Sequence, residues 1–159
     1  MVFQAESAGD IQAVRGLFRE YEAWLGIDLC FQSFEHEVAS LPGGYGPPAG
    51  ALLLAKAQEA GPAVGCAGLR RLSEDTVELK RLFVRPEHHG QGLGKQLLAA
   101  AIAEATARGY RRMRLDTVPQ LTTAIELYRR WGFQEIPPYN HSPIVGSLYF
   151  ELTLAHQGQ

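Results

Sequence analysis

The chain has 159 residues, of which 46% are hydrophobic, and its formal net charge is −2 at pH 7. This length suits a single domain over residues 1–159 with a full-sized core, and the composition excludes a disordered chain. Because basic residues are not in excess, nucleic acid is not expected as a partner. The chain has no apolar run that could span a bilayer and no signal-like start, so we expect a cytoplasmic protein without a membrane partner.

The cysteines, Cys30 and Cys66, carry no sign of a functional role. Their positions match neither a metal-binding spacing nor a disulfide-rich pattern, which is typical of a reducing cytoplasm. Free cysteines are usually small buried residues. We therefore expect neither a cysteine nucleophile nor a metal site.

The N-terminal third predicts a strand, two helices and a loop. Residues 2–6 have strand character, and Ser7 with Asp10 forms a capping box before a long amphipathic helix. A shorter helix is predicted over 31–40. The segment 41–48 is too rich in proline and glycine for regular structure.

Three strands are then expected as an antiparallel meander over 51–56, 63–72 and 77–84. Strict alternation on the third strand would place Glu78, Lys80, Leu82 and Val84 on one face and Leu79, Arg81 and Phe83 on the other. Three charges are more than a central strand buries, unless it opens to a cleft. Glu78 is the only acid on this strand, and it is either a general base or the partner of Lys80 or Arg81. The ion pair is preferred, because ion pairs perturb carboxylates as readily as catalysis does.

A glycine-rich turn joins the third strand to a helix predicted to begin near Gly92. Peptide N–H groups at a helix start lack intrahelical partners and lie at the positive end of the helix dipole. Glycines allow a phosphate to approach the backbone closely, and Lys95 adds a positive charge. The segment fits neither the Rossmann nor the P-loop pattern. It predicts an anion site formed by His89, Gly90, Gln91, Gly92, Leu93, Gly94 and Lys95, with an ordinary glycine turn as the alternative.

The C-terminal third continues with alternating elements. A strand over 113–117 follows the helix, and this strand–helix–strand order implies parallel pairing. The next helix, over 121–131, carries Tyr128 on its apolar face. Strands over 133–136 and 147–154 complete the prediction.

Two motifs in this order resemble the GNAT superfamily of N-acetyltransferases. The first is V-x-P followed by [QR]-x-x-G-x-[GA], matched by Val84-Arg85-Pro86 and the segment 89–94, with His89 in place of Gln or Arg. The second is A-x-x-L-Y-x-x-x-G-F, matched by residues 124–133. The resemblance implies an α/β (α+β) fold, with a central mixed, mostly antiparallel sheet of about six or seven strands and about four flanking helices.

The resemblance also implies a function, the transfer of an acetyl group from acetyl-CoA to a primary amine of a small molecule or peptide. Phe83 and Val84 would hold the pantetheine arm through the backbone, the glycine loop would hold the diphosphate, and Arg129 would reach the 3′-phosphate. Tyr128 would donate its phenolic proton to the coenzyme sulfur; helical periodicity alone favours a packing role for it. A non-catalytic acyl-CoA binding or sensing domain and a nucleotide-phosphate regulatory module remain alternatives.

The acceptor is less well defined. Candidates for lining its site are Glu35, Tyr45, Glu78, Tyr139 and Asn140; for Tyr45, an aromatic covering the surface is an equal alternative. An acidic lining would favour a cationic amine such as a polyamine, an amino acid or an aminoglycoside. A homodimer is compatible with the sequence.

Overall fold

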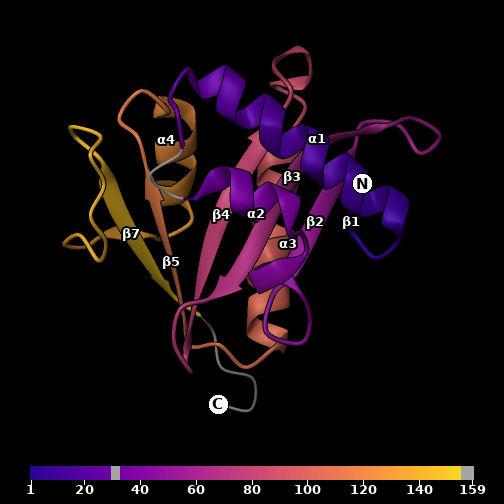
Figure 1. The fold of residues 1–159 in the computed structure, drawn as a ribbon. Coiled ribbons are helices and arrows are strands. Elements are labelled where there is room, and N and C mark those ends of the chain that lie inside the picture. Colours follow the sequence, from indigo (N-terminus) through magenta and orange to yellow (C-terminus); the bar gives the residue numbers. More distant parts are fainter. Residues whose placement is uncertain (30–32, 155–159) are drawn as a thin grey trace.

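The computed structural model describes residues 1–29 and 33–154 (Figure 1). The helices are α1 (Ala8–Leu25), α2 (Phe34–Ala39), α3 (Leu93–Ala107) and α4 (Thr122–Arg130), with short 3₁₀ turns at Gly43–Tyr45 and Pro86–His88. The strands are β1 (Val2–Gln4), β2 (Ala51–Lys56), β3 (Ala63–Arg71), β4 (Thr76–Val84), β5 (Arg112–Thr117), β6 (Gln134–Glu135) and β7 (Leu148–Thr153). The predicted helix over 31–40 is shorter, beginning at Phe34, and Cys30 and residues 31–32 lie outside the described residues.

The strands form one seven-stranded sheet in the order β1-β2-β3-β4-β5-β7-β6. All neighbouring strands pair antiparallel except β4 and β5, which are parallel. The prediction of a mixed, mostly antiparallel sheet with four flanking α-helices is therefore confirmed for the described residues. In this part of the chain no helix is both long and apolar enough to cross a bilayer.

Helices cover both faces of the sheet (Figure 1). Helices α1 and α2 pack on one face around Phe18, Phe34 and Leu54, and α3 and α4 pack on the other around Leu97 and Phe150. The predicted capping box starts α1, since Ser7 Oγ accepts from the Asp10 amide and the Asp10 carboxylate accepts from the Ser7 amide. The central strands β4 and β5 of this sheet diverge, and the candidate site lies between them.

Strand β4 carries a β-bulge that changes the direction of its side chains. Cys66 pairs with Phe83 and Gly68 with Lys80, so one β3 residue opposes both Arg81 and Leu82. Arg81 adopts φ of 60°, a left-handed conformation unusual for a residue with a side chain. The strict alternation predicted for this strand is therefore wrong beyond Lys80. Leu82 and Val84 return to the α3 side with Leu79, whereas Lys80, Arg81 and Phe83 all face α1 and α2.

The same strand separates from β5. Parallel pairing joins Thr76 to Arg112 and Glu78 to Arg114, and no pair follows, although β4 continues to Val84 and β5 to Thr117. The β5-facing edge of β4 thus has no strand partner beyond Glu78. This gap agrees with the cleft expected from three charges on a central strand.

Candidate functional site

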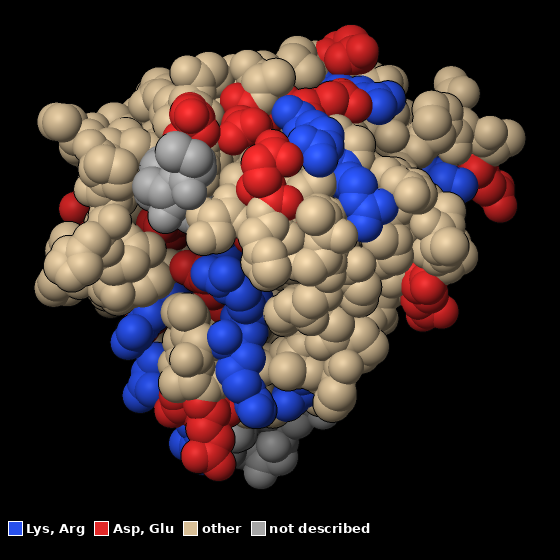
Figure 2. Space-filling model, in the orientation of Figure 1, with Lys and Arg blue, Asp and Glu red and all other residues tan. Residues whose placement is uncertain are grey.

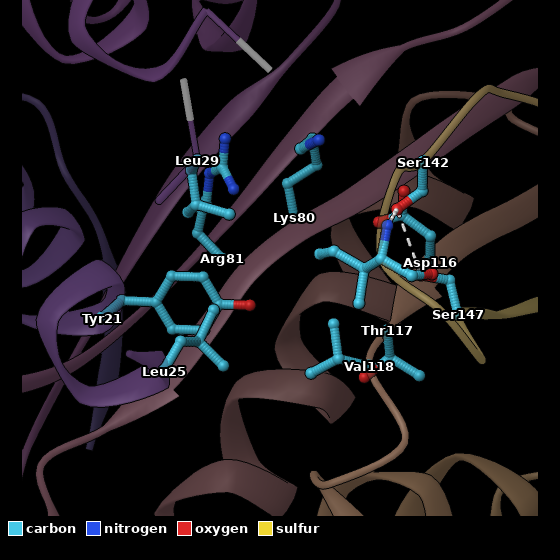
Figure 3. A pocket seen from close by; sticks show the side chains of 11 residues that line it. Tyr21, Leu25, Leu29, Lys80, Arg81, Asp116, Thr117, Val118, Ser142 and Ser147 are labelled. Carbon is cyan, nitrogen blue, oxygen red and sulfur yellow. Dashed lines mark hydrogen bonds between the residues drawn. The ribbon is translucent and has the colours of Figure 1, made fainter. Parts of the chain in front are cut away.

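A cleft opens in the gap between β4 and β5 on the α1 side of the sheet. Helix α1 contributes Tyr21 and Leu25, and the segment after it contributes Leu29. Strand β4 contributes Lys80 and Arg81, and β5 with the residue after it contributes Asp116, Thr117 and Val118. The loop before β7 contributes Ser142, Ile144 and Ser147 (Figure 3). We call this the strand cleft. It is built from five separate parts of the chain, which meet because β4 and β5 diverge.

The glycine loop lies at the start of α3, immediately after β4. Gly90 and Gly92 have φ of 83° and 79°, conformations that favour glycine. A Cβ added at Gly90, Gly92 or Gly94 would meet nothing within 4 Å, so open space lies above the backbone there. Gly92 is the N-cap of α3 and no side chain caps this end. The free N–H groups of the first helical turn therefore form a site that can accept an anion.

His89 is turned inward from this loop. Its Nε2 lies 2.7 Å from the Val84 carbonyl oxygen, and its ring lies 5.9 Å from the Trp24 ring. A carbonyl only accepts, so Nε2 carries the hydrogen and donates it to Val84. His89 thereby ties the glycine loop to the end of β4. Gln91 and Lys95 are exposed, with Gln91 Oε1 3.2 Å from His88 Nδ1.

Tyr128 of α4 is buried, with its ring centroid 5.5 Å from that of Phe133 and 6.2 Å from that of Phe150. Its hydroxyl has no hydrogen-bond partner in the described part of the chain. Burial raises the pKa of Tyr128, and the neighbouring Tyr21 and the charge of Asp116 raise it further. Tyr21 and Asp116 both line the strand cleft, so the Tyr128 hydroxyl is electrostatically coupled to that cleft.

Glu78 is held by two strong hydrogen bonds. Arg70 Nη2 donates to its Oε1 at 2.7 Å, and the Tyr139 hydroxyl donates to its Oε2 at 2.7 Å. The carboxylate is almost fully buried, and burial together with this carboxylate raises the pKa of Tyr139. The ion-pair interpretation of Glu78 is supported, but its partner is Arg70 on β3 rather than Lys80 or Arg81. With both oxygens engaged, Glu78 is poorly placed to act as a general base.

The charges inside the strand cleft are not all paired. Arg81 donates to Glu37 of α2 through Nε at 3.0 Å and Nη2 at 3.3 Å. Lys80 is 8% exposed, and no described residue forms an ion pair or hydrogen bond with its ammonium. Burial lowers the pKa of Lys80. Asp116 accepts from Asn140 Nδ2 at 2.9 Å. Figure 2 shows Lys and Arg side chains gathered below α2, with several Asp and Glu side chains above them on the same face.

The remaining predicted residues fall in different places. Phe83 lies among the α1 and α2 contacts, 5.5 Å from the Trp24 ring, whereas Val84 faces α3. Arg129 is 3.5 Å from Glu135 and lies over the Phe150 ring, on the side of β6 and β7.

Two of the predicted acceptor residues lie away from the cleft. Glu35 is exposed and paired with Arg19 at 3.3 Å. Tyr45 neither borders the strand cleft nor covers the surface. Its ring is buried against Gly68, where a Cβ would come within 2.7 Å of Tyr45 Cε1.

Tyr21 and Asp116 were not predicted from the sequence as site residues. The sequence could have indicated Asp116 as a site residue, because it is an acid near the C-terminal end of a strand expected to run parallel to β4. The sequence gives no such indication for Tyr21, because Tyr21 shares the apolar spacing of α1. Across the described residues, no group of three or more His, Cys, Asp and Glu side chains could hold a metal ion.

The sequence and the fold of this chain resemble those of known acetyltransferases. A model of the acetyltransferase (GNAT) family matches residues 12–133. An uncharacterised N-acetyltransferase of Schizosaccharomyces pombe is 37% identical over 147 residues, covering 92% of this chain and 90% of that protein. A GNAT-family acetyltransferase of Staphylococcus aureus superposes with a TM-score of 0.79 at 20% identity, covering 98% of this chain and 99% of the other. One from Elizabethkingia anophelis, solved with acetyl-CoA bound, has a TM-score of 0.56 at 24% identity, covering 66% and 77%.

Proposed function

Because this chain belongs to the acetyltransferase (GNAT) family, we propose that it transfers an acetyl group from acetyl-CoA to a primary amine of a small molecule or peptide. One observation carries the proposal. The uncapped, glycine-lined start of α3 directly follows a strand that separates from its parallel neighbour, and the Tyr128 hydroxyl is coupled to the resulting cleft. An anion site and an acceptor cleft thus lie at the two ends of one gap.

Acetyl-CoA fits the groups along this gap. The backbone from Gly90 to Lys95 would hold the diphosphate in the open space above the glycines. The β5-facing edge of β4 near Phe83 and Val84 would hold the pantetheine arm through backbone groups that lack a strand partner. A backbone N–H on this edge would stabilise the oxyanion of the tetrahedral intermediate. Arg129 contacts Glu135 and Phe150, and it would leave these contacts to reach the 3′-phosphate.

The transfer proceeds by direct attack within a ternary complex. The acceptor ammonium first loses a proton to water, and the neutral nitrogen attacks the thioester carbonyl carbon. The tetrahedral intermediate then collapses. Its C–S bond breaks while the new C–N bond remains, and the sulfur leaves with the proton of Tyr128. The second proton lost by the nitrogen restores the phenol, so the products are an amide, a free thiol and one released proton.

The raised pKa of Tyr128 makes it a weak acid towards the leaving sulfur. Burial raises its pKa, whereas a thiol has a pKa near 8.5, so full transfer to the thiolate is uphill until the nitrogen gives up its own proton. The phenol therefore hydrogen-bonds to the developing thiolate, and its proton passes to the sulfur as the second proton of the nitrogen replaces it. Water is the better proton acceptor for the ammonium, because Arg70 and Tyr139 occupy both oxygens of Glu78.

Release of free coenzyme A thiol, measured against a panel of amines, tests this function. We expect amine-dependent release with formation of the acetylated amine. Acetyl-CoA binding without release for any amine would favour the alternative, an acyl-CoA sensing domain. Tighter binding of ATP than of acetyl-CoA would favour a nucleotide-phosphate module.

A further inference from the structure

The separation of β4 and β5 leaves two opposite charges on the two sides of the strand cleft without contact. Thr76 pairs with Arg112 and Glu78 with Arg114. Continuing this parallel register by two residues would set Lys80 beside Asp116. The strands diverge before that point, so the two side chains stand on opposite sides of the strand cleft and form no ion pair (Figure 3).

Lys80 has no alternative partner among the described residues. Its nearest acid on the same strand, Glu78, is already bound by Arg70 and Tyr139. Glu37 is bound by Arg81. A lysine that is only 8% exposed and unpaired is costly, because burial disfavours the charged form. An anion entering the cleft would remove that cost.

The second oxygen of Asp116 has no hydrogen-bond partner among the described residues and can receive a cation. Its Oδ2 accepts from Asn140, whose own Oδ1 accepts from Tyr149 at 2.7 Å, and this chain of bonds fixes the carboxylate in place. Four apolar side chains, Leu25, Leu29, Val118 and Ile144, share the cleft walls with these charges and with polar side chains.

We propose that the acceptor is an amine that also carries a carboxylate on an apolar body, as in an apolar α-amino acid. Lys80 binds the carboxylate, Asp116 receives the ammonium, and the apolar walls contact the side chain. This assignment rests on the proposed acetyl transfer and narrows its substrate class. It disfavours polyamines and aminoglycosides, which bring only positive charge to a cleft that already contains an unpaired lysine.

Three matched amines test the proposal: L-leucine, L-leucinamide and 3-methylbutylamine, which share the amine and the apolar body but differ in the carboxylate. With acetyl-CoA saturating, we expect kcat/KM for leucine to exceed that of the other two by about 10- to 100-fold, the effect of a charge-assisted hydrogen bond in a site that excludes water. Phenylalanine and its two analogues repeat the comparison with a larger body.

Variants then assign the two charges. Lys80→Met should remove the preference, because kcat/KM should fall for leucine and should not fall for the other two amines, and Lys80→Arg should retain part of the preference. Asp116→Asn should lower kcat/KM for all three amines alike, since all three carry the ammonium group. Lys56→Met changes a lysine that lies over the Phe3 ring outside the cleft and serves as the matched control. Calorimetry with acetyl-CoA should give the same affinity for the Lys80 variants and the wild type.

Failure of this inference is distinguishable from failure of the proposed function. Two results would overturn the carboxylate assignment alone, in a protein that binds acetyl-CoA. One is equal kcat/KM for leucine, leucinamide and 3-methylbutylamine, and the other is an equal fall in kcat/KM for all three in Lys80→Met. If no amine is acetylated, leucine binding is measured directly by calorimetry on the protein with and without coenzyme A. Leucine binding that depends on Lys80 would support the assignment, and no binding would overturn it.

Discussion

Tyr128→Phe is the change that separates catalysis from packing. The Tyr128 ring packs between Phe133 and Phe150, and its hydroxyl donates to no described residue, so the variant loses no protein hydrogen bond. We expect the free energy of unfolding to change by less than about 0.5 kcal/mol. Loss of a general acid costs about 10²- to 10⁴-fold in rate. The raised pKa of Tyr128 makes it a weak acid, so we expect a fall in kcat of about 10²-fold with acetyl-CoA affinity unchanged.

The assay is single-turnover thiol release, in which product release does not limit the rate. Tyr110→Phe is the matched control. The Tyr110 hydroxyl donates to the Ala49 carbonyl at 2.6 Å, away from the strand cleft, so its loss should cost about 1 kcal/mol of stability and no activity. Equal single-turnover rates for Tyr128→Phe and wild type would return Tyr128 to a packing role.

Two other predictions concern protonation. Glu78→Gln should lower kcat less than about 10-fold, since a general base would contribute at least about 10²-fold; a larger loss in a folded protein would restore Glu78 as base. The pKa of Tyr21 is raised by burial to about 12, so above pH 10 the folded chain retains a proton that the unfolded chain loses. The free energy of unfolding, from urea titrations, should fall as pH rises from about 10 towards about 12, and Tyr21→Phe should lessen the fall.

The fold was predictable because its local patterns agree with one another. The capping box at Ser7, the meander from β2 to β4 and the parallel β4–β5 unit each follow from short-range spacing, and each is present. Element ends differ by up to three residues, because hydrogen bonding frays at the ends of helices and strands.

The site was less predictable, because its geometry depends on a break in periodicity. The bulge at Arg81 reverses the faces of β4 and brings Lys80 and Arg81 to the same side, which no alternation rule anticipates. The partners of Glu78 and Arg81 come from β3 and α2, so they are set by tertiary contacts and not by neighbours in sequence. The buried position of Tyr45 also depends on a tertiary contact that the sequence does not show, because its ring occupies the space left by the missing side chain at Gly68.

The most direct test of the central claim is calorimetric titration of acetyl-CoA into the wild type and two glycine variants. Gly92→Val and Gly109→Val both place a branched side chain at a positive φ, 79° and 88°, in open space, so they share the backbone strain. Only Gly92 lies where the diphosphate is proposed to bind. We expect the wild type and Gly109→Val to bind acetyl-CoA alike and Gly92→Val to lose at least about 10-fold in affinity, as a displaced charge-assisted contact would give. Equal affinity for all three folded proteins would contradict the account.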